Sequence, residues 1–355
     1  MQIDDLETPM LLVDKTVLEA NIQRMADYCN QHEIDLRVHV KSHKSPMIAY
    51  KQIAAGACGI VCQKLSEAEV FADTGFRNIL IPYNIVGAEK LNRLIWLAEW
   101  VSVSVTVDSL SVAEGISRAA KSAGHHVPIF IEIDTGGQRC GTQTPQASVA
   151  LGRRIVDLPH VELAGVMTFP TPPRCRPYLS ETLDLFEKAG IPIPIVSGGG
   201  TPHAFQTHDI PEITELRVGT YVFYDLSHVY WGVCEQLDCA LTVLTTVVST
   251  PTPDRVILDA GAKTLTGNHR TQPNPPHNRV YGITKDSCDA VLSYLSEEHG
   301  HLNTANVPRQ FQIGEKVQVI PTDSWATVSI NDTFALVRGA QVLEILPILA
   351  RGQTK

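Results

Sequence analysis

Apolar and polar residues follow two different periods along this chain, and segments of the two periods alternate. The stretch LRVHV (36–40) changes between apolar and polar at every residue, which is the period of a strand. The stretch before it, 14–29, places Leu18, Ile22, Met25 and Cys29 on one face, which is the period of a helix. Asp14 stands at its start as an N-cap residue.

The same reading predicts eight strands in the first part of the chain, each following a helical or linking segment. The strands cover residues 36–40, 59–63, 78–84, 101–108, 127–134, 161–169, 193–199 and 215–225. Helices are predicted over 49–57, 66–75, 89–100, 111–124, 144–159 and 180–190, and a polar connection over 202–213. Apolar strands that alternate with helices form a parallel sheet. Eight such units at this length favour an α/β fold closed into a (β/α)8 TIM barrel. No GxGxxG follows the first strand, which argues against a dinucleotide fold.

The pattern changes after about residue 235, where helical periodicity nearly disappears. Strands are predicted over 239–250, 255–261, 315–320, 325–330 and 335–339, with turn residues between them. We therefore expect a barrel domain, residues 1–235, and a C-terminal antiparallel β domain, residues 236–355. The Pro- and Asn-rich stretch 267–279 predicts a long surface loop.

Composition and charge narrow the class of protein. The net charge of −9, without a basic stripe, argues against nucleic-acid binding. No apolar run approaches the ~18 residues of a membrane helix, and the acidic start MQIDDLETPM has no apolar signal region. These features predict a cytoplasmic protein without a membrane partner. The eight cysteines are scattered without a CxxC pair, which indicates mostly buried, small apolar groups rather than a zinc site.

A barrel of this kind carries its active site at the C-terminal ends of its strands, with phosphate usually bound after the seventh and eighth. The seventh predicted strand ends in SGGGTPH, where Ser197 and Gly198 to Gly200 let the backbone approach a ligand and Thr201 adds a hydroxyl. The eighth carries Gly219 and Tyr221 as further donors. The alternative is a glycine turn required only by topology.

Lys41 follows the first strand, so its amine points toward the same end of the barrel. A phosphate site facing a lysine suggests pyridoxal 5′-phosphate (PLP) held as a Schiff base. Neighbouring cations lower a lysine pKa and free the amine to react. Lys44, three residues further on and before Pro46, is the second candidate. After the fifth strand, Arg139 could bind the cofactor's ring oxygen or a substrate carboxylate, or pair with Asp134 instead.

These segments together resemble the fold-type III PLP enzymes, which have an alanine racemase-like barrel. The closer similarity is to the D-threonine aldolase and D-serine dehydratase family. HVKSHKSP is similar to its PHxKTHK stretch, with Val38 where proline is usual, and this places the Schiff-base residue at Lys41. EIDTGGQRCG resembles DxGxxRxG, and SGGGTP resembles the family's phosphate loop. GTYVFYD, LDAGAKTL, LSEEHG and FQIGEKVQVIPTDSWATV also match, so the resemblance spans nearly the whole chain.

The resemblance implies PLP as the cofactor, a D-amino acid as the substrate and a homodimer as the assembly. It also implies a divalent metal (Mn, Mg or Zn) bound by PNHxC, but this chain has Asp323 at the histidine position and Trp325 at the second ligand position. Asp323 is therefore the remaining metal-ligand candidate, and one carboxylate makes a weak site. MTFPTPPR (167–174) also lacks the GHSY-like pattern of the family.

We expect Cα–Cβ cleavage of a D-3-hydroxy amino acid to glycine and an aldehyde, as in D-threonine aldolase. Lys41 or a nearby histidine would handle protons, and His299 is a further catalytic candidate from the β domain or a structural histidine. Three alternatives stay open at this point. They are dehydration of D-serine or a 3-hydroxy-D-amino acid, racemisation without a metal, and a non-catalytic PLP-binding protein.

Overall fold

The computed structural model of the chain describes residues 1–271 and 279–355, which form two compact units. The barrel unit contains Arg24–Lys41, Pro46–Gly219 and Gln353–Lys355. The sheet unit contains Met1–Gln23, Ser42–Ser45 and Thr220–Gly352. This division by contacts differs from the predicted domains at the N-terminus and at residues 220–235, which both join the sheet unit.

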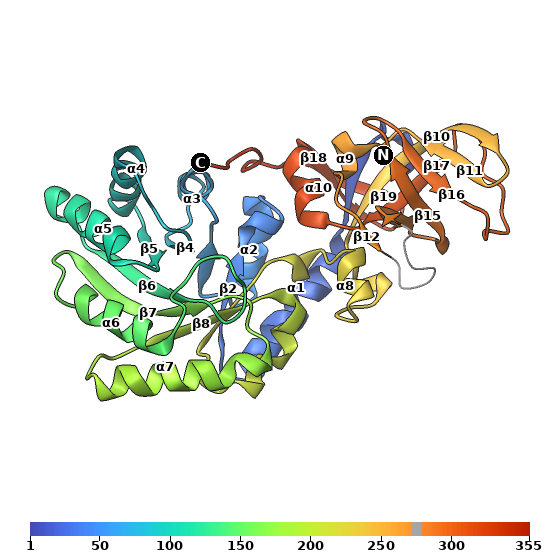
Figure 1. Cartoon of the computed structure of the whole chain (residues 1–355). Coiled ribbons are helices and arrows are strands. Elements are labelled where there is room, and N and C mark those ends of the chain that lie inside the picture. Colours follow the sequence, from blue (N-terminus) through green and yellow to red (C-terminus); the bar gives the residue numbers. More distant parts are fainter. Residues whose placement is uncertain (272–278) are drawn as a thin grey trace. The chain divides into compact units, whose positions relative to one another are not determined.

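Eight parallel strands close into a barrel in the order of the sequence, which confirms the predicted (β/α)8 architecture (Figure 1). They are β2 (Asp35–His39), β3 (Gly59–Val61), β4 (Asn78–Ile81), β5 (Ser102–Val107), β6 (Val127–Ile133), β7 (Val161–Thr168), β8 (Ile195–Gly199) and β9 (Glu215–Val218). β9 ends well before residue 225, the predicted strand end, because the chain turns at Gly219 into the 3₁₀ helix η5 (Thr220–Val222). Pairing between β2 and β9 closes the barrel.

Helices connect most of the strands at the predicted places. They are α1 (Lys15–Gln31), α2 (Pro46–Ala54), α3 (Leu65–Asp73), α4 (Ala88–Ala98), α5 (Leu110–Ala123), α6 (Pro145–Ile155) and α7 (Arg176–Lys188). Thr144 is the N-cap of α6, and its hydroxyl accepts the backbone N–H of Ala147. Pro145 occupies the first helical position. The connection between β8 and β9 contains η4 (Thr201–Asp209), and η2 (Val40–Ser42) follows β2. The remaining 3₁₀ turns are η1 (Ile3–Asp5), η3 (Pro173–Cys175) and η6 (Gln236–Asp238).

The sheet unit is built on a nine-stranded sheet in the order β11-β16-β15-β14-β17-β10-β1-β18-β19. Its strands are β1 (Met10–Asp14), β10 (Leu241–Thr252), β11 (Arg255–Leu258), β14 (Gly282–Thr284), β15 (Ser287–Leu295), β16 (Gly300–Asn303), β17 (Lys316–Pro321), β18 (Thr333–Arg338) and β19 (Gln341–Pro347). β12 (Arg270–Thr271) and β13 (Arg279–Val280) form a separate pair. The pairing is antiparallel, as predicted, except between β1 and β18.

The strand predicted over residues 325–330 is wrong, because this segment is the helix α10 (Ser324–Ile330). Its β-branched residues favour a strand, but Asp323 caps a helix here by accepting the backbone N–H of Ala326 at 3.1 Å. The other helices of the sheet unit are α8 (Leu226–Tyr230) and α9 (Ala262–Leu265). Local capping therefore overrides strand propensity in this segment.

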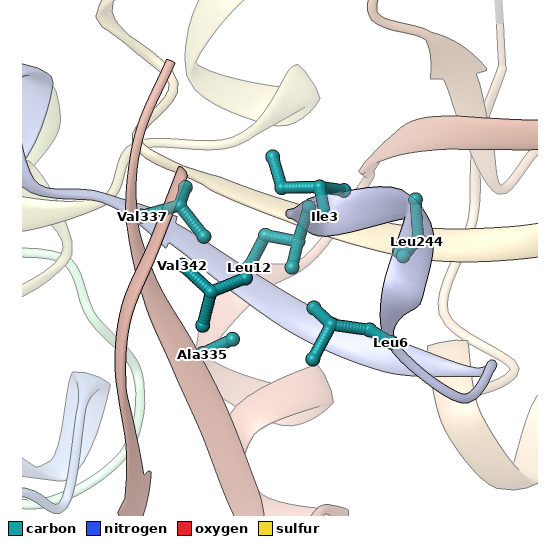
Figure 2. Packing of buried hydrophobic residues seen from close by; sticks show 7 residues of the cluster. All are labelled: Ile3, Leu6, Leu12, Leu244, Ala335, Val337 and Val342. Atoms are coloured by element: carbon teal, nitrogen blue, oxygen red, sulfur yellow. The ribbon is translucent and has the colours of Figure 1, made fainter. Parts of the chain in front are cut away.

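Residues from both ends of the chain meet in one hydrophobic cluster of the sheet unit (Figure 2). Its members are Ile3, Leu6, Leu12, Leu244, Ala335, Val337 and Val342. β1 carries Leu12 between β10 and β18, where Leu12 pairs with Thr242 and Ala335. The first 14 residues are thus part of the sheet's core and not an N-terminal extension of the barrel.

The seven cysteines whose side chains are described are free thiols, and Cys29, Cys62, Cys175 and Cys239 are buried. Among the described residues, no helix has both the length and the apolar character needed to cross a bilayer. Residues 272–278 of the predicted surface loop lie outside the described residues.

Candidate active site at the barrel mouth

Lys41 lies in η2, directly after β2, at the C-terminal end of the barrel strands. Arg37, on the same strand, donates to Glu215 of β9 at 2.6 Å and to Asn78 of β4 at 2.8 Å, so its side chain lies in the barrel interior. Residues two apart on a strand face the same side. His39 therefore also faces inward, and Lys41 follows it toward the mouth.

Gln63, just after β3, connects Lys41 with His39. Its side-chain oxygen lies 3.0 Å from Lys41 Nζ and 3.2 Å from His39 Nε2. Burial is the main cause that lowers the pKa of His39 well below its usual value, and the positive charges of Lys41 and Arg217 lower it further. His39 Nδ1 is buried and has no hydrogen-bond partner among the described residues. The imidazole is therefore neutral at physiological pH.

Arg217 on β9 is a buried cation in the same interior. It donates to Ser197 Oγ at 2.5 Å and to the Thr168 carbonyl at 2.8 Å. Burial lowers the pKa of Arg217 to about 10, against the opposing effect of Glu215 and Glu132. Burial also raises the pKa of Glu132. Ser197 Oγ in turn donates to Glu215, which links Ser197 to the Arg37–Glu215 ion pair.

The glycine segment at the end of β8 is held by two exchanged hydrogen bonds with Thr171. Gly199 N–H donates to Thr171 Oγ1 at 2.7 Å, and Thr171 N–H donates to the Gly199 carbonyl at 3.0 Å. A Cβ at residue 199 would lie 3.0 Å from the Arg217 carbonyl oxygen, so only glycine fits without displacement. Gly200 has φ of 120°, a conformation that favours glycine.

Gly200 leads into η4, whose first turn has no side-chain cap. Helix N-terminal N–H groups without a side-chain cap attract anions. Thr201 lies at this N-terminus and is buried, and Gly219 follows β9, the neighbouring strand. An uncapped helix start, a glycine cradle and the buried His39 Nδ1 fit a phosphate-bearing ring compound such as PLP.

Arg139 approaches the mouth from the segment after β6. Its guanidinium lies 3.2 Å from Glu132 Oε1 and over the ring of Phe169 at 5.2 Å, and its side chain is half exposed. Asp134, considered above as its partner, instead accepts the backbone N–H groups of Gly136 and Gln138. Arg139 therefore keeps exposed donor surface for a ligand.

Three further sequence-predicted residues belong to the sheet unit. Tyr221 is fully buried in η5. His299 is exposed in the turn between β15 and β16, where its carbonyl accepts the Ser296 N–H at 2.9 Å. Asp323 caps α10 and also accepts from Asn268 Nδ2 at 2.7 Å. The roles of these residues in catalysis or metal binding stay predictions.

The residues around Asp323 do not fit the two-ligand metal site that the resemblance implied. Both carboxylate oxygens of Asp323 already accept hydrogen bonds, and Trp325 has no atom suited to bind a metal. No group of three or more His, Cys, Asp or Glu residues suited to a metal occurs in the described part of the chain.

The structure adds residues to the mouth that the sequence did not single out. Gln63, Glu132, Thr171 and Arg217 all contact a predicted site residue. Gln63 and Thr171 do have a sequence signal, since Gln63 is the last residue of one predicted strand and Thr171 lies two residues after another, where barrel enzymes carry functional groups.

Comparison with known proteins places this geometry in a family. A model of the alanine racemase N-terminal domain matches residues 13–227, which is more than half of the chain. The chain belongs to this fold-type III family. The family is PLP-dependent. A second model, of a D-serine dehydratase-like domain, matches residues 240–337.

Several proteins resemble this fold-type III chain over its whole length. D-threonine aldolase of Arthrobacter sp is 33% identical, with 98% of this chain and 93% of the relative covered. D-threo-3-hydroxyaspartate dehydratase of Delftia sp. is 31% identical, with 91% and 92% covered. The crystal structure of D-threonine aldolase from Filomicrobium marinum has a TM-score of 0.90 at 30% identity, covering 100% of this chain and 98% of the other.

Proposed function

We propose that this protein is a PLP-dependent lyase that cleaves the Cα–Cβ bond of D-3-hydroxy amino acids, giving glycine and an aldehyde. The observation that carries the proposal is full-length similarity to D-threonine aldolase, combined with a lysine and a glycine cradle at one barrel mouth. When bound, PLP withdraws electrons from the bond that breaks at Cα.

Different residues of the barrel unit would bind the cofactor, bind the substrate and transfer protons. The Lys41 amine would hold the cofactor's carbonyl carbon and afterwards carry protons. The uncapped start of η4 and residues Gly198 to Thr201 would bind the phosphate, with Gly219 beside them. Arg139 would bind the ring oxygen or the substrate carboxylate. We also propose that the protein is a cytoplasmic homodimer, on the resemblance to the family alone.

Dehydration is the second candidate function, because the Delftia relative, 31% identical, is named as a dehydratase of D-threo-3-hydroxyaspartate. The two reactions share the cofactor and differ in the bond broken at Cα, which is Cα–Cβ in the aldol cleavage and Cα–H, with loss of the β-hydroxyl, in dehydration. Asp323 and Trp325 stand where the family motif has its two metal ligands, and they do not match that motif. The resemblance therefore does not assign a metal to either reaction.

A substrate panel separates the candidates. We expect D-threonine to give glycine and acetaldehyde, whereas a dehydratase would convert D-serine to pyruvate and ammonia, and a racemase would convert D-alanine to its L-isomer. Each assay is run with chelator and with added Mn²⁺, Mg²⁺ or Zn²⁺, and products are identified by chromatography. Absence of turnover on every D-3-hydroxy amino acid would contradict the proposal.

The cofactor assignment has its own test. Wild-type protein mixed with PLP should show the absorbance of a PLP–lysine adduct, and Lys41→Ala should abolish it. Lys64→Ala is the matched control, since Lys64 follows Gln63 and lies over the Tyr83 ring at 3.7 Å. Persistence of the adduct in Lys41→Ala would move the assignment to another lysine.

A further inference from the structure

One amide oxygen serves two side chains of the proposed site. Gln63 Oε1 lies 3.0 Å from Lys41 Nζ and 3.2 Å from His39 Nε2. The orientation of the amide is set from its other side, because its Nε2 donates to the Pro82 carbonyl at 3.4 Å. The Gln63 backbone N–H donates to Glu67 Oε2 at 2.6 Å, which anchors the residue to α3.

This arrangement determines where the His39 proton lies. An amide oxygen only accepts hydrogen bonds, so His39 Nε2 must carry the proton that it shares with Gln63. Since the imidazole is neutral, Nδ1 is left as a lone-pair acceptor, and this atom is buried without a partner among the described residues. An imidazole with the opposite tautomer would present Nδ1–H and lose its contact with Gln63.

We propose that Gln63 is a positioning residue for Lys41: its single side-chain oxygen aims the Lys41 amine and also selects, for the neutral His39 imidazole, the tautomer with its proton on Nε2. The proposal rests on the proposed function, since it assumes that the Lys41 amine reacts with PLP. An amide oxygen holds the amine without the full negative charge that would keep it protonated. His39, which is neutral because it is buried beside other cations, adds no second positive charge next to the amine.

Charged groups from β9, β6 and α3 surround Gln63, Lys41 and His39. Arg217 on β9 and Lys41 are the cations that act on His39. Glu132 on β6 and Glu215 on β9 act on Arg217. Glu67 on α3 accepts from the Gln63 backbone. Lys64, next in the chain, lies over the Tyr83 ring.

The acceptor that Gln63 presents to Lys41 is a neutral amide oxygen. Replacing Gln63 by glutamate therefore adds a negative charge next to the Lys41 amine.

Gln63→Glu tests the charge of that acceptor. We expect the pH midpoint for formation of the PLP–lysine adduct to rise by about one unit, so that adduct formation at pH 7 slows about tenfold. The measurement is the adduct absorbance after full-length, PLP-depleted protein is mixed with PLP across a pH series. Gln31→Glu is the matched control, because Gln31 is exposed at the end of α1. It makes the same change of charge and should leave the midpoint in place.

A second readout keeps the test decisive if Gln63→Glu does not fold. In ¹⁵N NMR spectra we expect wild-type His39 to show only the neutral tautomer protonated on Nε2, and Gln63→Met to show a mixture of tautomers. An unmoved midpoint in folded Gln63→Glu, or a single fixed tautomer in Gln63→Met, would overturn the proposal. A wild-type protein that forms no adduct would instead refute the proposed function, and the His39 spectrum would still report on Gln63.

Discussion

At the scale of single residues, the barrel interior is unusual for the number of charged groups it buries. Arg37, Arg217 and Glu215 are buried together and share hydrogen bonds through Ser197. Charges removed from water are stable only when each is paired and hydrogen-bonded. Replacing one of them leaves its partners without compensation.

Arg217→Met is therefore expected to lower the free energy of unfolding by about 3–5 kcal/mol, because Glu132 loses a nearby cation and the Thr168 carbonyl loses its donor. The measurement is urea unfolding followed by circular dichroism. Arg176→Met is the control, since Arg176 pairs with Glu212 at 3.1 Å with half of its side chain exposed. An exposed pair contributes only about 0–1 kcal/mol. Equal losses in the two variants would contradict this account.

The sequence located some of these residues and not others, for a physical reason. Lys41 and the glycines at 198–200 lie at or just after strand ends, a position that barrel topology makes recognisable. Arg217 lies within a strand that is buried on both sides, and such a strand does not reveal from sequence which side faces the barrel interior. The pairing of Arg139 with Glu132 instead of Asp134 depends on side-chain geometry in the same way.

At the scale of elements, α10 shows how one capping residue decides between helix and strand. Asp323 accepts from Ala326 N–H and from Asn268, while Ser324 N–H donates to Asp225 at 3.0 Å. Asp225 also caps α8 by accepting the His228 N–H. The starts of two helices are therefore fixed by two neighbouring carboxylates, which periodicity alone does not reveal.

Loss of the α10 cap in Asp323→Ala should lower the free energy of unfolding by about 1 kcal/mol at pH 7.

Burial raises the pKa of the Asp323 carboxyl, so protonation of this carboxyl stabilises the folded state, and the stabilisation is fully present below the unfolded pKa. It is lost as the pH rises through the folded pKa. Asp323→Asn cannot ionise, so wild type should gain stability relative to it between about pH 7 and pH 4.

Asp254→Asn is the control for this pH dependence. A hydrogen bond from the Thr252 hydroxyl lowers the pKa of the exposed Asp254 carboxyl. The sign is therefore reversed, and wild type should lose stability relative to Asp254→Asn as the pH falls. Chemical unfolding at a series of pH values measures both differences. The same slope for both variants would show that the burial of Asp323 does not govern its titration.

At the scale of the whole molecule, the sequence predicted both the barrel and the β-rich part, but not that the N-terminus belongs to the sheet unit. The alternation of strand and helix periods was sufficient to predict the barrel. The short predicted strands after residue 235 were sufficient to predict a β-rich part. The sequence pattern did not predict β1, because its pairing with β10 and β18 joins residues more than 200 positions apart. Nothing local in MLLVD indicates such partners.

Leu12→Ala is expected to lower the free energy of unfolding of the sheet unit by about 2–5 kcal/mol, because it leaves a cavity between β10 and β18. Leu343→Ala on the edge strand β19 is the control, since Leu343 is 38% exposed and opens no buried space. Its cost should be below about 1 kcal/mol. Thermal unfolding of both variants is the measurement, and comparable losses would show that β1 is not a core strand.

The pairing of β1 with β18 also has a consequence for synthesis on the ribosome. Residues 10–14 leave the exit tunnel early, but Thr333–Arg338 is translated about 320 residues later. At about 5–20 residues per second, this strand waits on the order of half a minute for its partner. All eight barrel strands are complete before then. Until β10 and then β18 emerge, the newly made MLLVD segment is therefore an apolar stretch that chaperones can recognise.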